Sequence, residues 1–384
     1  MVCLRRHGGG ISRRCRYCGH SSPLAPDAQA RRSRAPLNTF LAVALDKWDG
    51  DYSYTSYLGI ELLDLTPDAM GAVGQRQREQ WLGLLLADLR TFELGARDRV
   101  HGWLPERRPD AALLKKRMVL LDAAVGSVSP HPPGTTAPDP AHGADQLRAA
   151  APADQARRLS LCMQPVYVVH DEYMFIRVLQ AFGVTFAAMA AEMRDAIAAA
   201  RSGHAEVVAV QLAWCADTLA RARSLFSLLA TMPPKSFQIF RAYTVGASAI
   251  QSEAYKTFEA FCSPPSHERL ESPAYKAVPR LRDRVREEWD DLSSAMQDSI
   301  LQKRIDAHGI DLVRSAVHEL ERVHQRWKQT HWKMASRMIG SERGIGHTVG
   351  VPCLRDAIDN RLFTGGSWIR SAPCLARLTT ATCT

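Results

Sequence analysis

Apolar residues in the second half of the chain recur three and four positions apart, which is the period of an α-helix with one buried face. One stripe begins at Phe175 and ends at Ile197, and residues 204–230 repeat the pattern. Two prolines at 233–234 interrupt it, and residues 237–243 then read as a short new helix. The spacing therefore predicts two long helices, each with a buried face, followed by a break.

The last long helix is predicted from about residue 311 to residue 339. Its stripe alternates steps of four and three residues and consists of Val313, Val317, Leu320, His324, Trp327, His331, Met334 and Met338. Further helices are expected over residues 74–95, 110–125 and 280–305, the last of them highly charged. Strand patterns are nearly absent, so the sequence predicts an all-α fold, a bundle of long helices.

Two regions lack the apolar content to fold by themselves. Residues 1–36 hold eight arginines and one acid, and residues 127–156 hold six prolines among small residues. We therefore expect five regions along the chain: a basic, disordered leader over 1–45, an N-terminal helical segment over 46–126, a Pro/Ala-rich linker over 127–160, the main helical domain over 161–363 and a C-terminal tail over 364–384.

The 384 residues have the composition of a soluble protein, with 46% apolar and 23% charged residues. Of the net charge of +9, residues 1–36 contribute +7, so the nearly neutral body gives no electrostatic reason to bind nucleic acid. No uninterrupted apolar run approaches the roughly 18 residues of a membrane span. We expect neither a nucleic-acid partner nor a membrane partner.

Nine cysteines are spread widely along the chain, which favours a reducing, cytoplasmic location. The only close pair, Cys15 and Cys18, is followed by His20 and could begin a zinc site in a nucleic-acid binder. A zinc ribbon requires a second pair at matching spacing, which the sequence lacks. A disordered leader is the simpler interpretation of this segment.

Two histidines occupy apolar positions of the last stripe. His324 and His331 lie seven residues apart on one helix face, a separation of about 10 Å that is too large for both to bind one metal ion. A histidine that faces a core is commonly hydrogen-bonded and inert. The functional alternative is an axial ligand, because a single imidazole in a dry slot of methionine and aromatic side chains can hold a haem iron.

Three further segments contain candidate chemistry. His170-Asp171-Glu172 begins a helix, where acids suit the positive dipole end, so it is either an ordinary cap or a site with His170 at the mouth of the core. Arg241 stands among apolar and small residues and is either solvated or a fork for a carboxylate. The glycine loop over 340–350 follows a helix, which argues against a dinucleotide site and leaves a closing loop as the alternative.

Together these motifs resemble those of the tryptophan 2,3-dioxygenase superfamily of histidine-ligated haem oxygenases. Residues 326–331 resemble the family's R-W-x-x-x-H segment, and residues 170–176 its H-D-E-x-x-F-I helix start. The resemblance continues in its F-R motif with a downstream Q-S, its Y-G-x-Y-L motif and its glycine loop ending in L-R, at residues 240–252, 54–58 and 340–355. The matched regions, a bit under half of the chain, are residues 49–63, 166–262 and 318–363.

The resemblance implies a helical bundle that holds haem b between long helices, with His331 as the proximal iron ligand and Trp327 beside the cofactor. Arg241 then grips the substrate carboxylate, and His170 is the candidate that moves a proton near the bound oxidant. The substrate pocket is expected to include Tyr54, Tyr57, Leu58, Phe175, Leu179, His347 and Thr348. Because the family's tyrosine motif reaches into a neighbouring subunit, we expect a homo-oligomer, a dimer or tetramer, with exchanged N-terminal segments.

The chain departs from the family's pattern at several points. Counted without gaps from His170, the family's distal histidine, which accepts the indole N–H of tryptophan, falls on Leu179. An indole N–H buried there without a partner costs about 1–3 kcal/mol. About a hundred residues, 64–165, separate the tyrosine motif from His170. The family's threonine and serine chemistry in the glycine loop is replaced by Ile345, His347, Thr348 and Val349.

These departures favour a sister branch that hydroxylates aromatic amino acids with peroxide. We expect 3-hydroxylation of L-tyrosine, or of a ring-substituted tyrosine, in the biosynthesis of natural products such as antibiotics. A branch that anchors its haem through a cysteine four residues after the ligand is not matched, because Ala335 stands there. The alternatives are a tryptophan 2,3-dioxygenase that converts L-tryptophan and dioxygen to N-formylkynurenine, and a helical haem-binding or regulatory protein without turnover.

Overall fold

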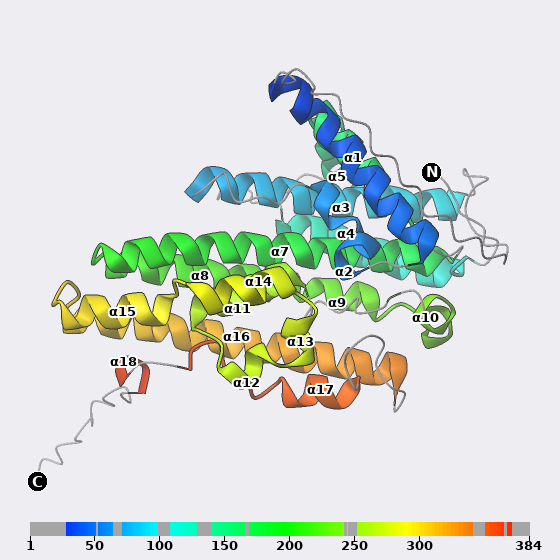
Figure 1. Ribbon diagram of the computed structural model, residues 1–384. Coiled ribbons are helices and arrows are strands. Elements are labelled where there is room, and N and C mark those ends of the chain that lie inside the picture. Colours follow the sequence, from blue (N-terminus) through cyan, green and yellow to red (C-terminus); the bar gives the residue numbers. More distant parts are fainter. Residues whose placement is uncertain are drawn as a thin grey trace, which may run out of the picture.

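The computed structural model describes ten stretches of the chain, residues 28–50, 53–63, 71–98, 108–128, 140–165, 169–241, 244, 252–340, 350–364 and 367–370. Every regular element within these ranges is a helix. The long helices run roughly along one direction and are stacked in layers (Figure 1). The predicted all-α fold is confirmed.

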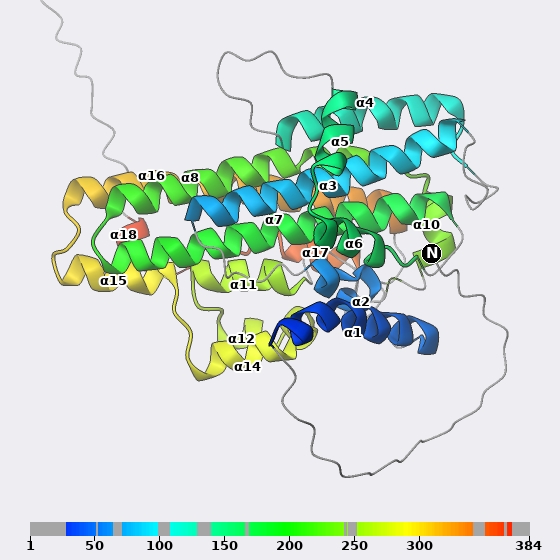
Figure 2. The ribbon, with the colours of Figure 1, turned by 90° about the horizontal axis from the view of Figure 1, so that it is seen from above.

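Three long helices form the centre of the bundle: α7 (His170–Arg201), α8 (Ala205–Ala222) and α16 (Ala307–Ile339). They lie side by side in both views, and α8 packs against both of the others (Figures 1 and 2). The apolar stripe predicted for α7 is buried along its whole length. Among the described helices α7 alone is long and apolar enough to cross a membrane, but 94% of its apolar window is buried, as in a core helix.

A second layer of helices covers one side of α7. α3 (Gly71–Asp98) lies along α7, and α4 (Ala111–Val128) and α5 (Pro140–Ala149) pack on α3. Gly83 permits the close approach of α3 and α5, because a Cβ at this position would lie 3.1 Å from Leu147 Cδ1. This layer is built from residues 64–165, the part of the chain that the sequence motifs leave unassigned.

The linker expected over residues 127–160 is in part helical. It contains α5 and most of α6 (Ala153–Leu161), and Ala144 and Leu159 are buried. Pro140 is the first residue of α5 and Pro152 precedes α6. At these positions a missing backbone N–H breaks no helical hydrogen bond, so the prolines begin helices here instead of preventing them.

The N-terminal end of the described chain is also helical. α1 (Ala28–Asp49) begins inside the expected leader, of which residues 1–27 lie outside the described part. α2 (Tyr54–Leu58) and the 3₁₀ helix η1 (Ile60–Leu63) follow and pack against α1. Gly59 joins them with a left-handed φ of 60°, and a Cβ there would lie only 2.8 Å from the carbonyl oxygen of Cys162. Glycine is therefore required at this turn.

Shorter helices complete the bundle: α9 (Ser224–Leu229), α10 (Pro234–Arg241), α11 (Glu253–Cys262), α12 (His267–Leu270), α13 (Pro273–Lys276), α14 (Pro279–Glu287), α15 (Leu292–Leu301), α17 (Val351–Asp356) and α18 (Ser367–Arg370). The single charged helix expected over residues 280–305 is therefore two helices. The second begins where the Asp291 side chain accepts a hydrogen bond from the Ser294 backbone N–H, a typical N-cap.

A buried ionic cluster fastens α12 and α13 to α11. Glu259 of α11 pairs with Lys256 Nζ at 2.8 Å and with the guanidinium of Arg269, and the Tyr275 hydroxyl donates to Glu259 at 3.4 Å. Burial alone would raise the pKa of Glu259, but Lys256 and Arg269 outweigh it and lower this pKa to about 2.

We expect this cluster to lose its stabilising effect in acid. A carboxylate with a lowered folded-state pKa stabilises the fold above its unfolded pKa of 4.5, and the contribution disappears as the pH falls towards about 2. Over this window the free energy of unfolding should fall more steeply in the wild type than in Glu259→Gln, by on the order of 3 kcal/mol. Urea titrations at several pH values measure both proteins, and parallel pH dependences would contradict the assignment.

Candidate active site

His331 lies on α16 in aromatic surroundings. Its ring stacks on Phe226 of α9 with centroids 5.9 Å apart and lies 5.5 Å from the ring of Trp327, one turn earlier on α16. Its Nδ1 atom is buried and has no protein hydrogen-bond partner among the described residues. Burial lowers the pKa of His331 to about 4, so the imidazole is neutral near pH 7.

A neutral imidazole has one ring-nitrogen lone pair that can bind a metal ion. The described residues contain no group of three or more histidine, cysteine or acidic side chains that could hold a metal ion. Among the described residues a metal ion at His331 therefore finds no further group of protein ligands, which fits a haem iron, whose other ligands come from the porphyrin. The residues present fit a histidine-ligated haem that His331 would hold.

His324, the other histidine of the stripe, has a different environment. Its Nε2 lies 2.9 Å from the hydroxyl of Tyr255, and both residues are almost fully buried. His324 is therefore a hydrogen-bonded core histidine, which is one of the two interpretations that the sequence left open. Trp327 between the two histidines is fully buried and contacts aromatic rings of three other helices, α7, α9 and α11, those of Phe182, Phe186, Phe226 and Tyr255.

The apolar face of α7 connects His331 with α10. Phe182 contacts both Phe226 at 5.0 Å and Trp327 at 5.9 Å, which are the two rings around His331. One turn earlier lies Leu179, which is buried, and a further turn earlier Phe175. The ring of Phe175 lies 5.4 Å from that of Phe240 on α10. Leu179 therefore lies on the aromatic face between His331 and α10.

Arg241 is the last residue of α10 and is buried. Its backbone carbonyl accepts hydrogen bonds from Thr244, from the N–H at 3.0 Å and from the hydroxyl at 2.8 Å. α10 is held against the end of α16 by Gln238, whose Nε2 donates to the Met338 carbonyl at 3.2 Å. Arg241 directly follows Phe240, so the structure brings the predicted carboxylate-binding residue to the Phe175 end of the aromatic face.

His170 lies in a buried ionic cluster that the sequence motifs did not reveal. Its Nε2 is 2.9 Å from Glu93 Oε2, and its ring stacks on Phe92 at 4.5 Å. Arg117 Nη1 donates to Glu93 at 3.1 Å and the same guanidinium pairs with Asp171. Glu93 comes from α3 and Arg117 from α4, both far from His170 in sequence. In the sequence, these two residues stand out only as charged residues inside apolar helical segments.

The position of His170 differs from the expected one. Nine residues separate it from Leu179, which places the two about half a turn apart around α7, since each residue turns the helix by about 100°. His170 thus faces α3, and the structure does not bring it to the aromatic face with Leu179.

The tyrosine-motif residues Tyr54, Tyr57 and Leu58 are buried residues of α2. The Tyr57 hydroxyl donates to Glu172 Oε1 at 3.0 Å, which ties α2 to the first turn of α7 of the same chain. Burial raises the pKa of Tyr54, so its hydroxyl stays protonated. Leu58 is fully buried. The other two predicted pocket residues, His347 and Thr348, lie outside the described residues.

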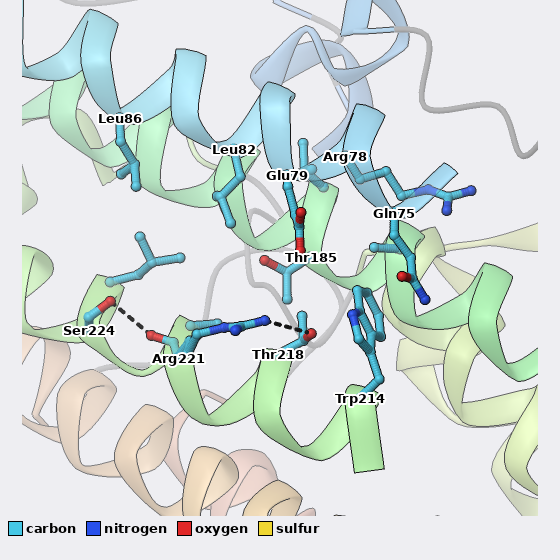
Figure 3. A pocket seen from close by; sticks show the side chains of 14 residues that line it. Gln75, Arg78, Glu79, Leu82, Leu86, Thr185, Trp214, Thr218, Arg221 and Ser224 are labelled. Carbon is cyan, nitrogen blue, oxygen red and sulfur yellow. Dashed lines mark hydrogen bonds between the residues drawn. The ribbon is translucent and has the colours of Figure 1, made fainter. Parts of the chain in front are cut away.

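A small crevice lies apart from these residues, between α3, α7, α8 and α9 (Figure 3). Its volume of about 40 Å³ is enough for water molecules but not for an aromatic amino acid. Leu82 and Leu86 line one side, and Thr218 and Arg221, joined by a hydrogen bond of 3.4 Å, line the other. The crevice is no candidate for the substrate pocket.

The fold and the site together define a class, all-helical proteins in which a neutral histidine lies among aromatic rings. No protein-family model matches the chain. It is 27% identical over 222 residues to the tryptophan 2,3-dioxygenase of Nocardioides sp., a match that covers 49% of this chain and 80% of the relative. It is 24% identical over 233 residues to that of Bordetella parapertussis, covering 52% and 82%. These relatives, at 24–27% identity over about half of the chain, support the tryptophan 2,3-dioxygenase superfamily.

Proposed function

We propose that the protein is a haem-dependent oxygenase that acts on an aromatic amino acid. The cofactor is haem b, because members of this superfamily are haem-dependent. The observation that carries the proposal is His331, a neutral imidazole among aromatic rings, with no cluster of metal ligands around it among the described residues. The relatives' names support the same class of reaction.

Each residue of the slot has a role that its surroundings support. Bound haem supplies an iron that activates dioxygen or peroxide. His331 holds the iron through a ring nitrogen. Arg241 binds the substrate carboxylate through charge-assisted hydrogen bonds, which are strong because the residue is buried. The apolar side chains of Phe175, Leu179 and Phe182 exclude water and hold the aromatic ring.

His170 acts, in this proposal, by positioning α7. Its contact with Glu93 and that of Asp171 with Arg117 fix the first turn of the helix. Glu172 in the same turn holds Tyr57, and with it the tyrosine motif. Proton transfer near the oxidant is then assigned to bound water or to the substrate itself.

Two reactions remain for this pocket, and different observations favour them. The names of the relatives favour a tryptophan 2,3-dioxygenase, which forms N-formylkynurenine from L-tryptophan and dioxygen. The buried Leu179 favours 3-hydroxylation of L-tyrosine with hydrogen peroxide, since leucine offers an indole N–H no acceptor. Product analysis of the reconstituted enzyme with each substrate pair distinguishes them. A catechol supports hydroxylation, and N-formylkynurenine supports ring cleavage. If the enzyme forms neither product, the proposed class of reaction is wrong.

Replacing Leu179 with histidine should improve the use of L-tryptophan. An imidazole there can accept the indole N–H, and restoring a buried hydrogen bond of about 1–2 kcal/mol raises kcat/KM by roughly 5- to 30-fold. Leu179→Met is the matched control, because it keeps an apolar side chain of similar size. If Leu179→His and Leu179→Met change kcat/KM for L-tryptophan equally, the side chain at this position does not face the substrate ring.

We also propose a homo-oligomer, as tryptophan 2,3-dioxygenases generally are. α1 carries an exposed apolar stripe for such a contact, consisting of Leu37, Leu41, Leu45 and Trp48. Exchange of the N-terminal segment and a cytoplasmic location are parts of the same proposal. The double substitution Leu41→Glu and Leu45→Glu should lower the mass measured by light scattering on a sizing column. An unchanged mass would exclude α1 from the interface.

A further inference from the structure

A hydrogen-bonded tyrosine and histidine lie behind the proposed iron ligand. Tyr255 of α11 and His324 of α16 are each about 1% exposed, and the Tyr255 hydroxyl lies 2.9 Å from His324 Nε2. The phenol can donate this bond when the His324 proton is on Nδ1, which is buried without a partner among the described residues. The pair has no part in the proposed binding of cofactor or substrate.

Stacked rings connect this pair with His331. The Tyr255 ring lies 5.7 Å from that of Trp327 at an interplanar angle of 23°, and Trp327 lies 5.5 Å from His331. These distances are those of aromatic rings in direct contact. Phe186 closes the stack with an edge toward each of Tyr255 and Trp327, at 4.9 and 5.2 Å. An electron can therefore move from Tyr255 to His331 through contacting π-systems without crossing solvent.

We propose that Tyr255 is a redox-active tyrosine, coupled to His324 for its proton and to His331 through Trp327, which is oxidised when hydrogen peroxide meets the haem enzyme without substrate. The proposal rests on haem binding at His331. Its consequence is that oxidising equivalents leave the active site along a defined route when no amino acid is there to consume them.

The proton transfer follows from the surroundings of the pair. Burial raises the pKa of Tyr255 far above its usual value, so the phenol does not ionise by itself. Loss of an electron makes the phenol a strong acid. Burial disfavours a positive charge on the oxidised ring, as it disfavours a negative charge on the phenolate. The proton must leave with the electron, and His324 is its hydrogen-bonded acceptor, kept neutral by burial that lowers its pKa.

One hydrogen peroxide takes up two electrons, together with two protons from solvent, and becomes two water molecules. Tyr255 of the same chain gives one of these electrons, its O–H bond breaks and the proton moves to His324 Nε2. The bound haem would give the other electron. The product in each chain is a neutral tyrosyl radical hydrogen-bonded to an imidazolium.

The test is electron paramagnetic resonance of the haem-loaded protein, frozen after mixing with hydrogen peroxide in the absence of amino acid. We expect a tyrosyl radical signal that changes shape when the protein contains ring-deuterated tyrosine. Tyr255→Phe, which keeps the ring and its packing, should remove most of this signal. His324→Gln should do the same, because an amide can accept a hydrogen bond but not a proton. Tyr173→Phe is the control, since the Tyr173 hydroxyl donates to Asp88 on another side of α7.

The outcomes separate this inference from the proposed function. Each variant is first checked for stoichiometric haem by its Soret absorption. If Tyr255→Phe binds no haem, His324→Gln and the deuterated wild type decide. A haem-loaded wild type whose radical is not a tyrosine, or whose signal survives either variant, overturns the relay and leaves the oxygenase proposal intact. A wild type that binds no haem overturns both.

Discussion

Replacement of His331 by alanine is expected to abolish stoichiometric haem binding while leaving the helical fold intact. His331 is the proposed iron ligand, and the described residues contain no cluster of metal ligands that could replace it. Other contacts hold α16 in the bundle, since its residues Val317, Leu320 and Trp327 are fully buried. Circular dichroism should therefore remain unchanged, whereas the Soret band after reconstitution should largely disappear.

Two controls sharpen this experiment. His318→Ala removes an exposed histidine from the same helix and should bind haem like the wild type. Added imidazole can occupy the space left in His331→Ala and should restore the Soret band in part. Normal ligation in the variant without imidazole would show that another residue holds the iron.

Replacement of Arg241 by alanine is expected to raise KM strongly for the amino-acid substrate with little effect on haem content. A buried guanidinium that binds a carboxylate contributes about 1.5–3 kcal/mol, which corresponds to a roughly 10- to 100-fold change. Arg241→Lys should recover only part of the affinity, because an ammonium keeps the charge but loses the planar fork.

Steady-state kinetics and substrate-induced shifts of the Soret band measure this effect independently. Arg337→Ala is a suitable control, because Arg337 is an exposed residue near the end of α16 whose Nη1 donates to the Ala230 carbonyl at 2.9 Å. If Arg241→Ala binds the amino acid as the wild type does, another residue binds the carboxylate and Arg241 does not have the role that the motif implies.

The helical periodicity predicted the core of this fold well. The stripe from Phe175 to Ile197 is buried as expected, and so is most of the stripe on α16. Both patterns are local, since packing on one face requires apolar residues at fixed spacing. Low apolar content predicted a linker over residues 127–160, but part of this segment forms α5 and α6. Pro140 and Pro152 stand at the starts of these helices, where proline is tolerated.

The candidate site was predictable only in part. The motif at residues 326–331 favoured His331 over His324 as the iron ligand. In the structure His324 is hydrogen-bonded to Tyr255, whereas His331 has no hydrogen-bond partner among the described residues. The environment of His170 could not be predicted. Its partner Glu93, and Arg117 which pairs with Glu93, lie 77 and 53 residues away in sequence, and no local pattern relates a charge on one helix to a histidine on another.

The insertion between the tyrosine motif and α7 thus has a structural explanation. α3 and α4 bring Glu93 and Arg117 to the first turn of α7, and Asp88 of α3 accepts hydrogen bonds from Tyr173 and Arg177 one and two turns further on. The added layer fastens the helix that carries Leu179 and Phe175. A segment without a recognisable motif therefore supports the face on which the substrate is proposed to lie.

The absorption spectrum of the purified wild-type protein after haem supplementation shows whether the protein binds haem as proposed for His331. We expect one haem per chain, measured as pyridine haemochrome, with a Soret band typical of histidine-ligated iron. A protein that remains folded but retains no haem would make His331 a core histidine without a role in cofactor binding.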